Sequence, residues 1–158
     1  MKNLNKLNKK DEGAALIEFA IVLPLLLILI FGTIEFGLYL FNTQVLTNAA
    51  REGARRGVIM RSQPRSVSEE DAAVVARVMQ FVDNNLVTFG NFSFGEDDII
   101  VYSVVDESTG DPMPRVEGDL GFGKDLIVTA NFTYDFLFIS TLGIGPIDIK
   151  PVSRMKME

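Results

Sequence analysis

A long apolar segment near the N-terminus constrains this chain more than any other feature of its sequence. Residues 19–34 carry no charge, and residues 14–41 are nearly all apolar, interrupted by Glu18 and Glu35. Roughly 20 apolar residues in a helix are needed to cross a bilayer core about 30 Å thick. We therefore expect residues 14–41 to form a transmembrane helix.

The two carboxylates in this stretch indicate how the predicted helix is placed in the bilayer. Glu18 and Glu35 are seventeen residues apart, which in a helix corresponds to roughly 26 Å at about 1.5 Å per residue. We expect them to lie near opposite interfaces, where a charge costs much less than at the bilayer centre. Pro24 lies between them and removes one backbone hydrogen bond, which membrane helices tolerate.

The residues flanking the span bear on its processing and orientation. An ordinary secretory signal peptide has a short apolar region closely followed by a cleavage site of small residues. Here the apolar run is long, and polar helix-forming residues follow it at 42–56. Charge alone leaves the orientation open, because lysines precede the span and arginines follow it. A cytoplasmic N-terminus is favoured by four early lysines, Lys2, Lys6, Lys9 and Lys10.

Length and composition limit what the rest of the chain can be. Its 158 residues leave room for one domain beside a membrane segment. Cysteine and histidine are absent from the sequence, which removes disulfides, thiolate chemistry, serine–histidine–aspartate triads and most zinc sites. The net charge of −6 argues against a nucleic-acid partner. We expect a protein that is not an enzyme and uses no cofactor.

Charge divides the chain into regions. Residues 42–65 contain five arginines and one glutamate, a net charge of +4. Residues 66–158 contain six basic and sixteen acidic residues, a net charge of −10. The chain therefore has a basic stem beside the membrane segment and an acidic domain beyond it.

The stem, residues 42–60, keeps a helical pattern. Ala49, Gly53 and Gly57 recur every four residues and form a stripe of small side chains, which allows another helix to approach closely. Each glycine costs about 1 kcal/mol of helix stability relative to alanine, so packing is a reasonable explanation for the stripe. It fits packing against the chain's own head domain, and it also fits a seam between two subunits.

The head, residues 61–158, is predicted to begin with a break at 61–65 and an amphipathic helix. Ser68, followed by three acidic residues, is the expected helix start, and the helix is expected to end near residues 84–85. The apolar face expected from helical spacing consists of Ala72, Val75, Ala76, Met79, Val82 and Leu86.

Beyond this helix the apolar period changes to two, which indicates strands. Residues 99–105 are rich in β-forming residues, and residues 126–136 alternate so clearly that one strand with one buried face is expected. Residues 147–157 alternate as well, and Pro151 predicts an edge or bulged strand there. The expected fold class is α+β: a long membrane-spanning helix continuing into a stem, then a small head with one amphipathic helix on an antiparallel sheet.

A loop rich in glycine, proline and acidic residues lies between residues 106 and 125. Carboxylate and carbonyl oxygens are ligands for Ca²⁺, and weak calcium candidates here are Asp106, Asp111 and Asp119, with Glu107. Their spacing does not match an EF-hand loop. A solvated loop without metal is the alternative.

The N-terminal motif resembles a known processing signal. Gly13, followed after four residues by Glu18-Phe19, resembles the cleavage site of type IV pilin-like proteins, and more narrowly that of the tight-adherence (Tad) pilus system. The wider sequence is similar to the TadE-like family. The residues that carry this likeness are the Glu-Phe-Ala before the apolar run, Pro24 in Leu-Pro-Leu-Leu, the Glu35-Phe36-Gly37 exit and the Ala-Ala-Arg-Glu-Gly-Ala-Arg of residues 49–55.

The resemblance implies cleavage between Gly13 and Ala14 by a prepilin peptidase on the cytoplasmic side. Residues 1–13 would be the basic leader, and Glu18 would become the fifth residue of the mature chain. Glu18, with Phe19 beside it, would set the register of assembly by pairing with the new Ala14 ammonium of a neighbouring subunit. The alternative is a Glu18 that simply lies at the level of the lipid headgroups.

The size of the head refines what the resemblance implies. Major subunits of these pili are little more than the helix, whereas residues 61–158 form a head of about a hundred residues. A minor pilin or pseudopilin in the bacterial cytoplasmic membrane is therefore implied, with the head outside and other pilin subunits and membrane lipid as partners. A single-span sensor or ligand-binding protein with an acidic head is the alternative.

Overall fold

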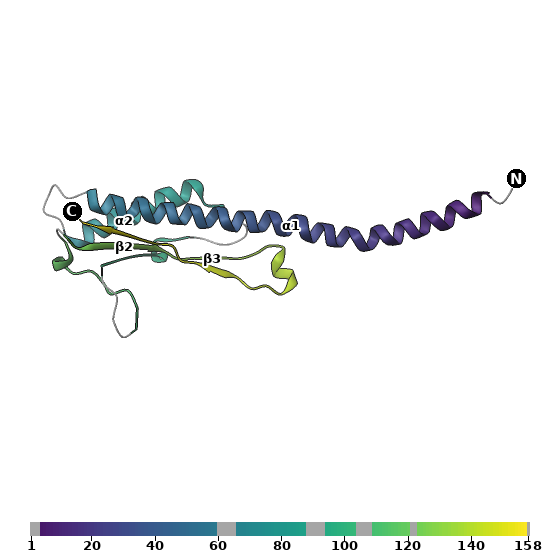
Figure 1. Ribbon diagram of the computed structural model, residues 1–158. Helices are drawn as coiled ribbons and strands as arrows, with labels where there is room; N and C mark the ends of the chain where they lie inside the picture. Colours follow the sequence, from purple (N-terminus) through teal and green to yellow (C-terminus); the bar gives the residue numbers. More distant parts are fainter. Residues whose placement is uncertain (1–3, 60–65, 88–93, 104–108, 121–122, 158) are drawn as a thin grey trace.

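The computed structural model describes residues 4–59, 66–87, 94–103, 109–120 and 123–157, and for residues 4–12 the helical backbone alone. Its helices are α1 (Leu4–Ile59) and α2 (Val67–Asn85), with short 3₁₀ turns η1 (Glu96–Asp98), η2 (Glu117–Asp119) and η3 (Ile139–Leu142). Its strands are β1 (Ile99–Tyr102), β2 (Asp125–Ala130), β3 (Phe132–Tyr134), β4 (Ile147–Ile149) and β5 (Val152–Lys156). The predicted α+β fold is confirmed, and Figure 1 shows α1 projecting far beyond the head.

The helix α1 is one continuous element. Its 56 residues correspond to about 84 Å, and Pro24 lies inside it without ending it. Within the described residues one helix is long and apolar enough to cross a membrane, over Gly13–Ile59, and none of its most apolar window, of mean hydropathy 2.8, is buried. The described helix therefore joins the predicted span to the predicted stem without interruption.

The second helix begins earlier than predicted. Ser66, not Ser68, is the N-cap: its hydroxyl accepts a hydrogen bond from the Glu69 amide at 3.2 Å, and the Glu69 carboxylate accepts one from the Ser66 amide at 3.2 Å. This reciprocal pair is a capping box. The predicted end is confirmed, since α2 stops at Asn85.

The buried face of α2 differs from the predicted one. Ala72 and Ala76 are exposed, whereas Val74 and Val78 are fully buried. Apolar residues occur in adjacent pairs along this helix, so two stripes about 100° apart fit the sequence almost equally well. The stripe that packs inward consists of Val67, Val74, Val78 and Val82, together with Glu70.

The strands form a hairpin in two sections. β2 pairs with β5, and β3 pairs with β4, both antiparallel. The pairs Asp125–Lys156 and Phe132–Ile149 follow the same register, so residues 125–134 and 147–156 are two arms of one long hairpin. Continuing that register would place Pro151 opposite Ala130, and proline has no N–H to donate. The single strand predicted over residues 126–136 is therefore wrong: the ladder is interrupted, and β2 and β3 belong to different sheets.

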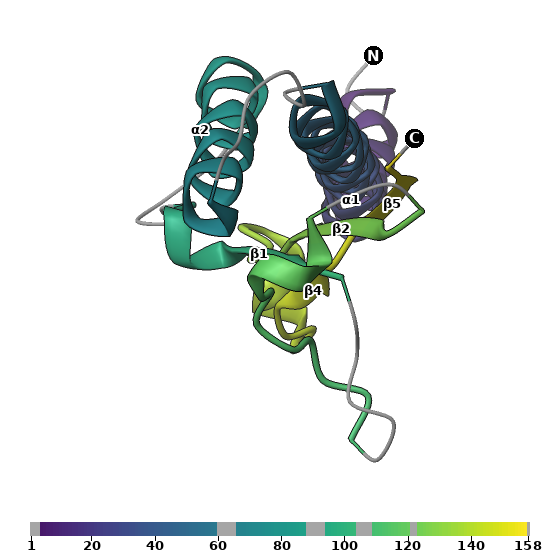
Figure 2. The ribbon, with the colours of Figure 1, turned by 90° about the vertical axis from the view of Figure 1, so that its left-hand side faces the viewer.

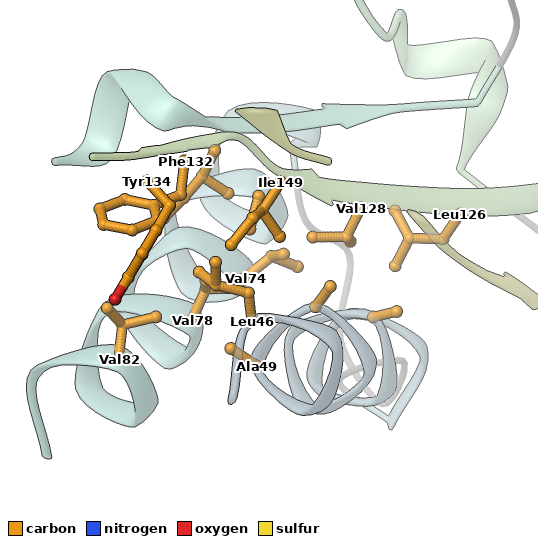
Figure 3. Close-up of a cluster of buried hydrophobic side chains, with 14 of the residues drawn as sticks. Leu46, Ala49, Val74, Val78, Val82, Leu126, Val128, Phe132, Tyr134 and Ile149 are labelled. Carbon is orange, nitrogen blue, oxygen red and sulfur yellow. The ribbon is translucent and has the colours of Figure 1, made fainter. Parts of the chain in front are cut away.

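The core lies where the two helices cover the sheet of order β1-β2-β5. Figure 2 shows α1 and α2 side by side over the same face of this sheet. Figure 3 shows the side chains between them, with valines of α2 and Leu46 of α1 facing Leu126, Val128 and Ile149. The C-terminal half of α1 is thus part of the head's own core.

The stripe of small residues lies inside this core. Ala49 is fully buried, and a Cβ atom added to Gly53 would lie 2.4 Å from Val78 Cγ2. A Cβ atom added to Gly57 would lie 2.4 Å from Leu126 Cδ2. The structure therefore places the stripe against the chain's own α2 and β2.

Candidate functional site

The predicted processing residues lie on the part of α1 that extends away from the head. Ala14 and Glu18 are exposed, Phe19 is 61% exposed, and Gly13 is partly exposed. A Cβ atom added to Gly13 would meet no other atom within 4 Å. These side chains are therefore free to meet a peptidase or another subunit, and the helix spaces Ala14 and Glu18 about 6 Å apart along its axis.

This part of α1 is apolar on every side. Large apolar side chains between 39% and 70% exposed occur along it at Leu16, Ile17, Phe19, Ile21, Val22, Leu25, Leu26, Leu27, Ile28, Leu29, Ile30 and Phe31. An apolar surface of this extent needs a partner that excludes water, and a helix apolar all round is typical of a membrane span. From Ala14 to Phe31 it measures about 26 Å along the helix axis, close to the thickness of one bilayer core.

Glu35 marks the point where the head begins to cover α1. Its side chain is buried, with 5% of the residue exposed, and its carboxylate accepts hydrogen bonds from three successive backbone amides, those of Leu137, Phe138 and Ile139. The bond from Phe138 N to Oε1 is 3.0 Å and that from Ile139 N to Oε2 is 2.8 Å. These amides precede and begin η3, so the carboxylate binds the free N–H groups at the start of this turn.

Aromatic contacts between α1 and the hairpin accompany the bonds from Glu35 to the amides of residues 137–139, called here the Glu35 clamp. Phe31 and Phe138 lie with ring centroids 4.7 Å apart, and Tyr39 meets Tyr134 edge-on at 5.7 Å. Burial raises the pKa of the Tyr134 phenol, and the nearby Glu35 charge raises it further. The clamp and these ring contacts together join the hairpin end to α1.

Sequence reasoning missed the role of Glu35 and treated it as a carboxylate at the membrane interface. The sequence does hold a signal, because residues 136–147 carry no charge and their backbone amides need acceptors if they are buried. A carboxylate in an otherwise apolar helix is one such acceptor. Which turn it would bind depends on long-range packing, and the pattern does not contain that.

A second polar clamp ties α2 to α1. Asn42 is fully buried, its amide nitrogen donates to the Val87 carbonyl at 2.7 Å, and its amide oxygen accepts from the Val87 amide at 3.1 Å. A buried side chain that is satisfied in this bidentate way specifies one alignment of two elements. Asn42 therefore fixes the position of the chain just after α2 against α1.

A buried arginine ties the acidic loop to the start of α2. The Arg115 side chain has no exposed surface and donates to Glu70 at 2.9 Å and to Asp71. Burial raises the pKa of the Asp71 carboxyl, and the Arg115 charge opposes this shift. The Val67 amide also donates to Glu117 at 3.1 Å, so the described part of the loop is fastened to the head.

The structure does not group the described calcium candidates into a metal site. Asp106 lies outside the described residues, Asp111 is exposed, and Asp119 accepts a hydrogen bond from the Val116 amide at 3.0 Å. That bond, aided by one from Ser103, lowers the pKa of Asp119. In the parts of the chain that the structure describes, no three carboxylates are grouped where they could hold a metal ion.

A groove of about 460 Å³ lies between the exposed faces of α1 and α2. Arg77, in its wall, donates to Glu52 at 2.7 Å, and Glu52 lies 3.8 Å from Arg55. These charges largely satisfy one another on an accessible surface, where such pairs contribute little to stability.

Comparison with known proteins bears on most of α1. Residues 13–55 match the model of the family described as TadE-like protein. A search of curated proteins and one of solved structures each found no match. The matched range contains the predicted processing residues, the exposed apolar part of α1, the Glu35 and Asn42 clamps, and Ala49 and Gly53. The resemblance drawn from the sequence is confirmed over this range, so the chain has a TadE-like N-terminal segment at residues 13–55.

Proposed function

We propose that this chain is a minor pilin or pseudopilin that assists the assembly of a Tad pilus. The observation that carries the proposal is the exposed apolar half of α1 within the range that matches the TadE-like family. A single helix apolar on every side suits both storage in a bilayer and packing against the helices of other subunits. The role is one of structure and assembly, not of catalysis.

In this proposal a prepilin peptidase removes residues 1–13 on the cytoplasmic side. The helix from Ala14 onward then stays in the cytoplasmic membrane, with the head outside. The cut creates an ammonium group on Ala14, and in a low-dielectric setting an opposite charge nearby strongly favours it. Glu18 is exposed one helical turn away, so it is available to the Ala14 ammonium of a neighbouring helix.

The proposal is tested at the new N-terminus. Mass spectrometry of the membrane-extracted protein, from cells with and without prepilin peptidase, should give a chain starting at Ala14 only when the peptidase is present. Gly13→Leu should block this cleavage, because a bulky side chain replaces the small residue at the cut.

Gly32→Leu is the matched control. A Cβ atom at Gly32, as at Gly13, meets no other atom within 4 Å, so both variants should leave the head intact. Cleavage should persist in Gly32→Leu. An intact leader in peptidase-positive cells expressing the unaltered chain would refute the pilin proposal and favour a single-span sensor.

A further inference from the structure

The end of the long hairpin carries an apolar surface that the core does not use. Residues 136–147, called here the hairpin tip, contain no charged residue and are flanked by Asp135 and Asp148. Leu137 is 58% exposed and Leu142 54% exposed. The exposed large apolar residues of the tip are Leu137, Leu142, Ile144 and Ile147, which are more than half of those found in the described part of the head.

The hairpin tip lies on the membrane side of the head. Figure 1 shows η3 alongside α1 at the end of the head nearest the projecting helix. The Glu35 clamp and the ring contact between Phe31 and Phe138 hold it there. About 20 residues counted from Ala14, the length that crosses a bilayer core, end near Thr33. The tip is thus fixed to α1 at the depth where the span meets the outer interface.

Several polar groups of the hairpin tip are paired within the protein. Glu35 accepts three of its amides, the Thr141 hydroxyl donates to the Phe138 carbonyl at 2.6 Å, and the Gly143 amide donates to the Ser140 carbonyl at 3.0 Å. Backbone that reaches the acyl region must satisfy its hydrogen bonds within the protein, because the acyl region offers no partners. These bonds lower the cost of placing this turn against lipid.

We propose that the hairpin tip inserts into the outer interface of the same membrane that α1 spans. Its exposed apolar side chains would contact lipid at the boundary between headgroups and acyl chains. Apolar side chains around an uncharged turn, continuous with the apolar surface of a span, fit this boundary. The inference rests on the membrane span of α1 in the proposed function, and it is independent of leader cleavage and of pilus assembly.

The test uses the full chain in lipid vesicles, with single cysteines carrying a polarity-sensitive fluorophore. The chain has no cysteine of its own, so each label is unique. Leu142→Cys and Ile144→Cys report on the tip. Val116→Cys is the control, because Val116 is 63% exposed and follows Arg115, which binds the start of α2. Ile28→Cys reports on the span itself.

Labels at Leu142 and Ile144 should show blue-shifted emission and strong quenching by bromine-labelled phospholipid, as at Ile28. The label at Val116 should be quenched by aqueous iodide instead. Aqueous quenching at Leu142 with lipid quenching at Ile28 would overturn this inference alone. Aqueous quenching at Ile28 would overturn the membrane span and this inference with it. Shielding of Leu142 from both quenchers, increasing with protein concentration, would assign the tip to a second copy and refute lipid insertion.

Discussion

At the scale of single residues, Glu35 is the side chain whose environment most changes the interpretation of the chain. A carboxylate in a membrane-type helix is costly unless it is paired. Here three backbone amides of the head satisfy it. The same contact attaches the head to the helix. It therefore offsets the cost of burying the Glu35 carboxylate and also fixes the position of the hairpin tip.

Glu35→Gln should destabilise this attachment. The amide side chain keeps one oxygen acceptor but loses the charge, and charge-assisted hydrogen bonds contribute about 1.5–3 kcal/mol. We expect a lower unfolding midpoint in detergent and faster hydrogen exchange at the amides of Leu137 and Ile139. Glu18→Gln is the matched control, because Glu18 is exposed. Equal midpoints and equal exchange rates in the two variants would contradict the clamp.

Asp119 leads to a prediction about pH. A backbone hydrogen bond from Val116 lowers its pKa below the ordinary value of 3.8. The stability that it contributes is therefore fully present above that value and is lost as pH falls through the lower pKa of the folded state. Asp119→Asn should reduce the acid-side loss of stability measured by denaturation between neutral and strongly acidic pH. Asp111→Asn, in the exposed part of the same loop, should keep the steeper dependence.

At the scale of elements, the close approach of α1 to α2 and β2 depends on its glycines. Gly53→Ala and Gly57→Ala would each place a Cβ atom 2.4 Å from a buried side chain, and overpacking of this kind costs about 1–3 kcal/mol. Gly37→Ala is the control, since a Cβ atom there meets nothing within 4 Å, and it should stabilise the helix by up to about 1 kcal/mol. Chemical denaturation ranks the three variants. A Gly53→Ala variant as stable as Gly37→Ala would show that the two helices do not pack as described.

The elements also show what the sequence could and could not predict. Residues 126, 128, 130, 132, 134 and 136 are buried as the alternation predicts, because a strand presents alternate residues to one face. The expectation of a single buried face is wrong for β2, since Ile127 and Thr129 between them are buried as well. It does not reveal the interruption opposite Pro151, since that depends on which strand pairs there. The predicted face of α2 was wrong in part, at Ala72 and Ala76, for a related reason: adjacent apolar pairs leave the choice of stripe to tertiary packing. The Glu35 contact joins residues about a hundred positions apart, and local pattern does not encode it.

At the scale of the whole molecule, the chain divides at about Glu35 into an exposed apolar half and a half covered by its own head. The predicted boundary between span and stem, at residues 41–42, lies within the covered half, because Asn42 is fully buried. The surface left for other subunits or lipid is therefore mainly the stretch from Ala14 to about Phe31, with smaller exposed apolar areas beyond it at Ile34, Phe36, Leu40 and Phe41.

Glu18→Ala tests the proposed assembly role at this scale. Cleavage should continue, because Gly13 and Ala14 are unchanged, whereas pili should be lost because the Ala14 ammonium of a neighbour has no opposite charge to meet. Immunoblotting of the mature chain and electron microscopy of the cells provide the two measurements. Glu52→Ala is a control that removes a carboxylate from the covered half of α1. Normal piliation in Glu18→Ala would exclude the register role.

The continuity of α1 has a mechanical consequence. No break in the described helix separates the part before Glu35 from the part that forms the head's core, and the hairpin tip is bound to the helix at the point where the two parts meet. A turn of the helix about its own axis must therefore turn the head through the same angle. In a stack of such helices, the direction in which each head faces would be decided by the contacts of the apolar half, without any contact between the heads themselves.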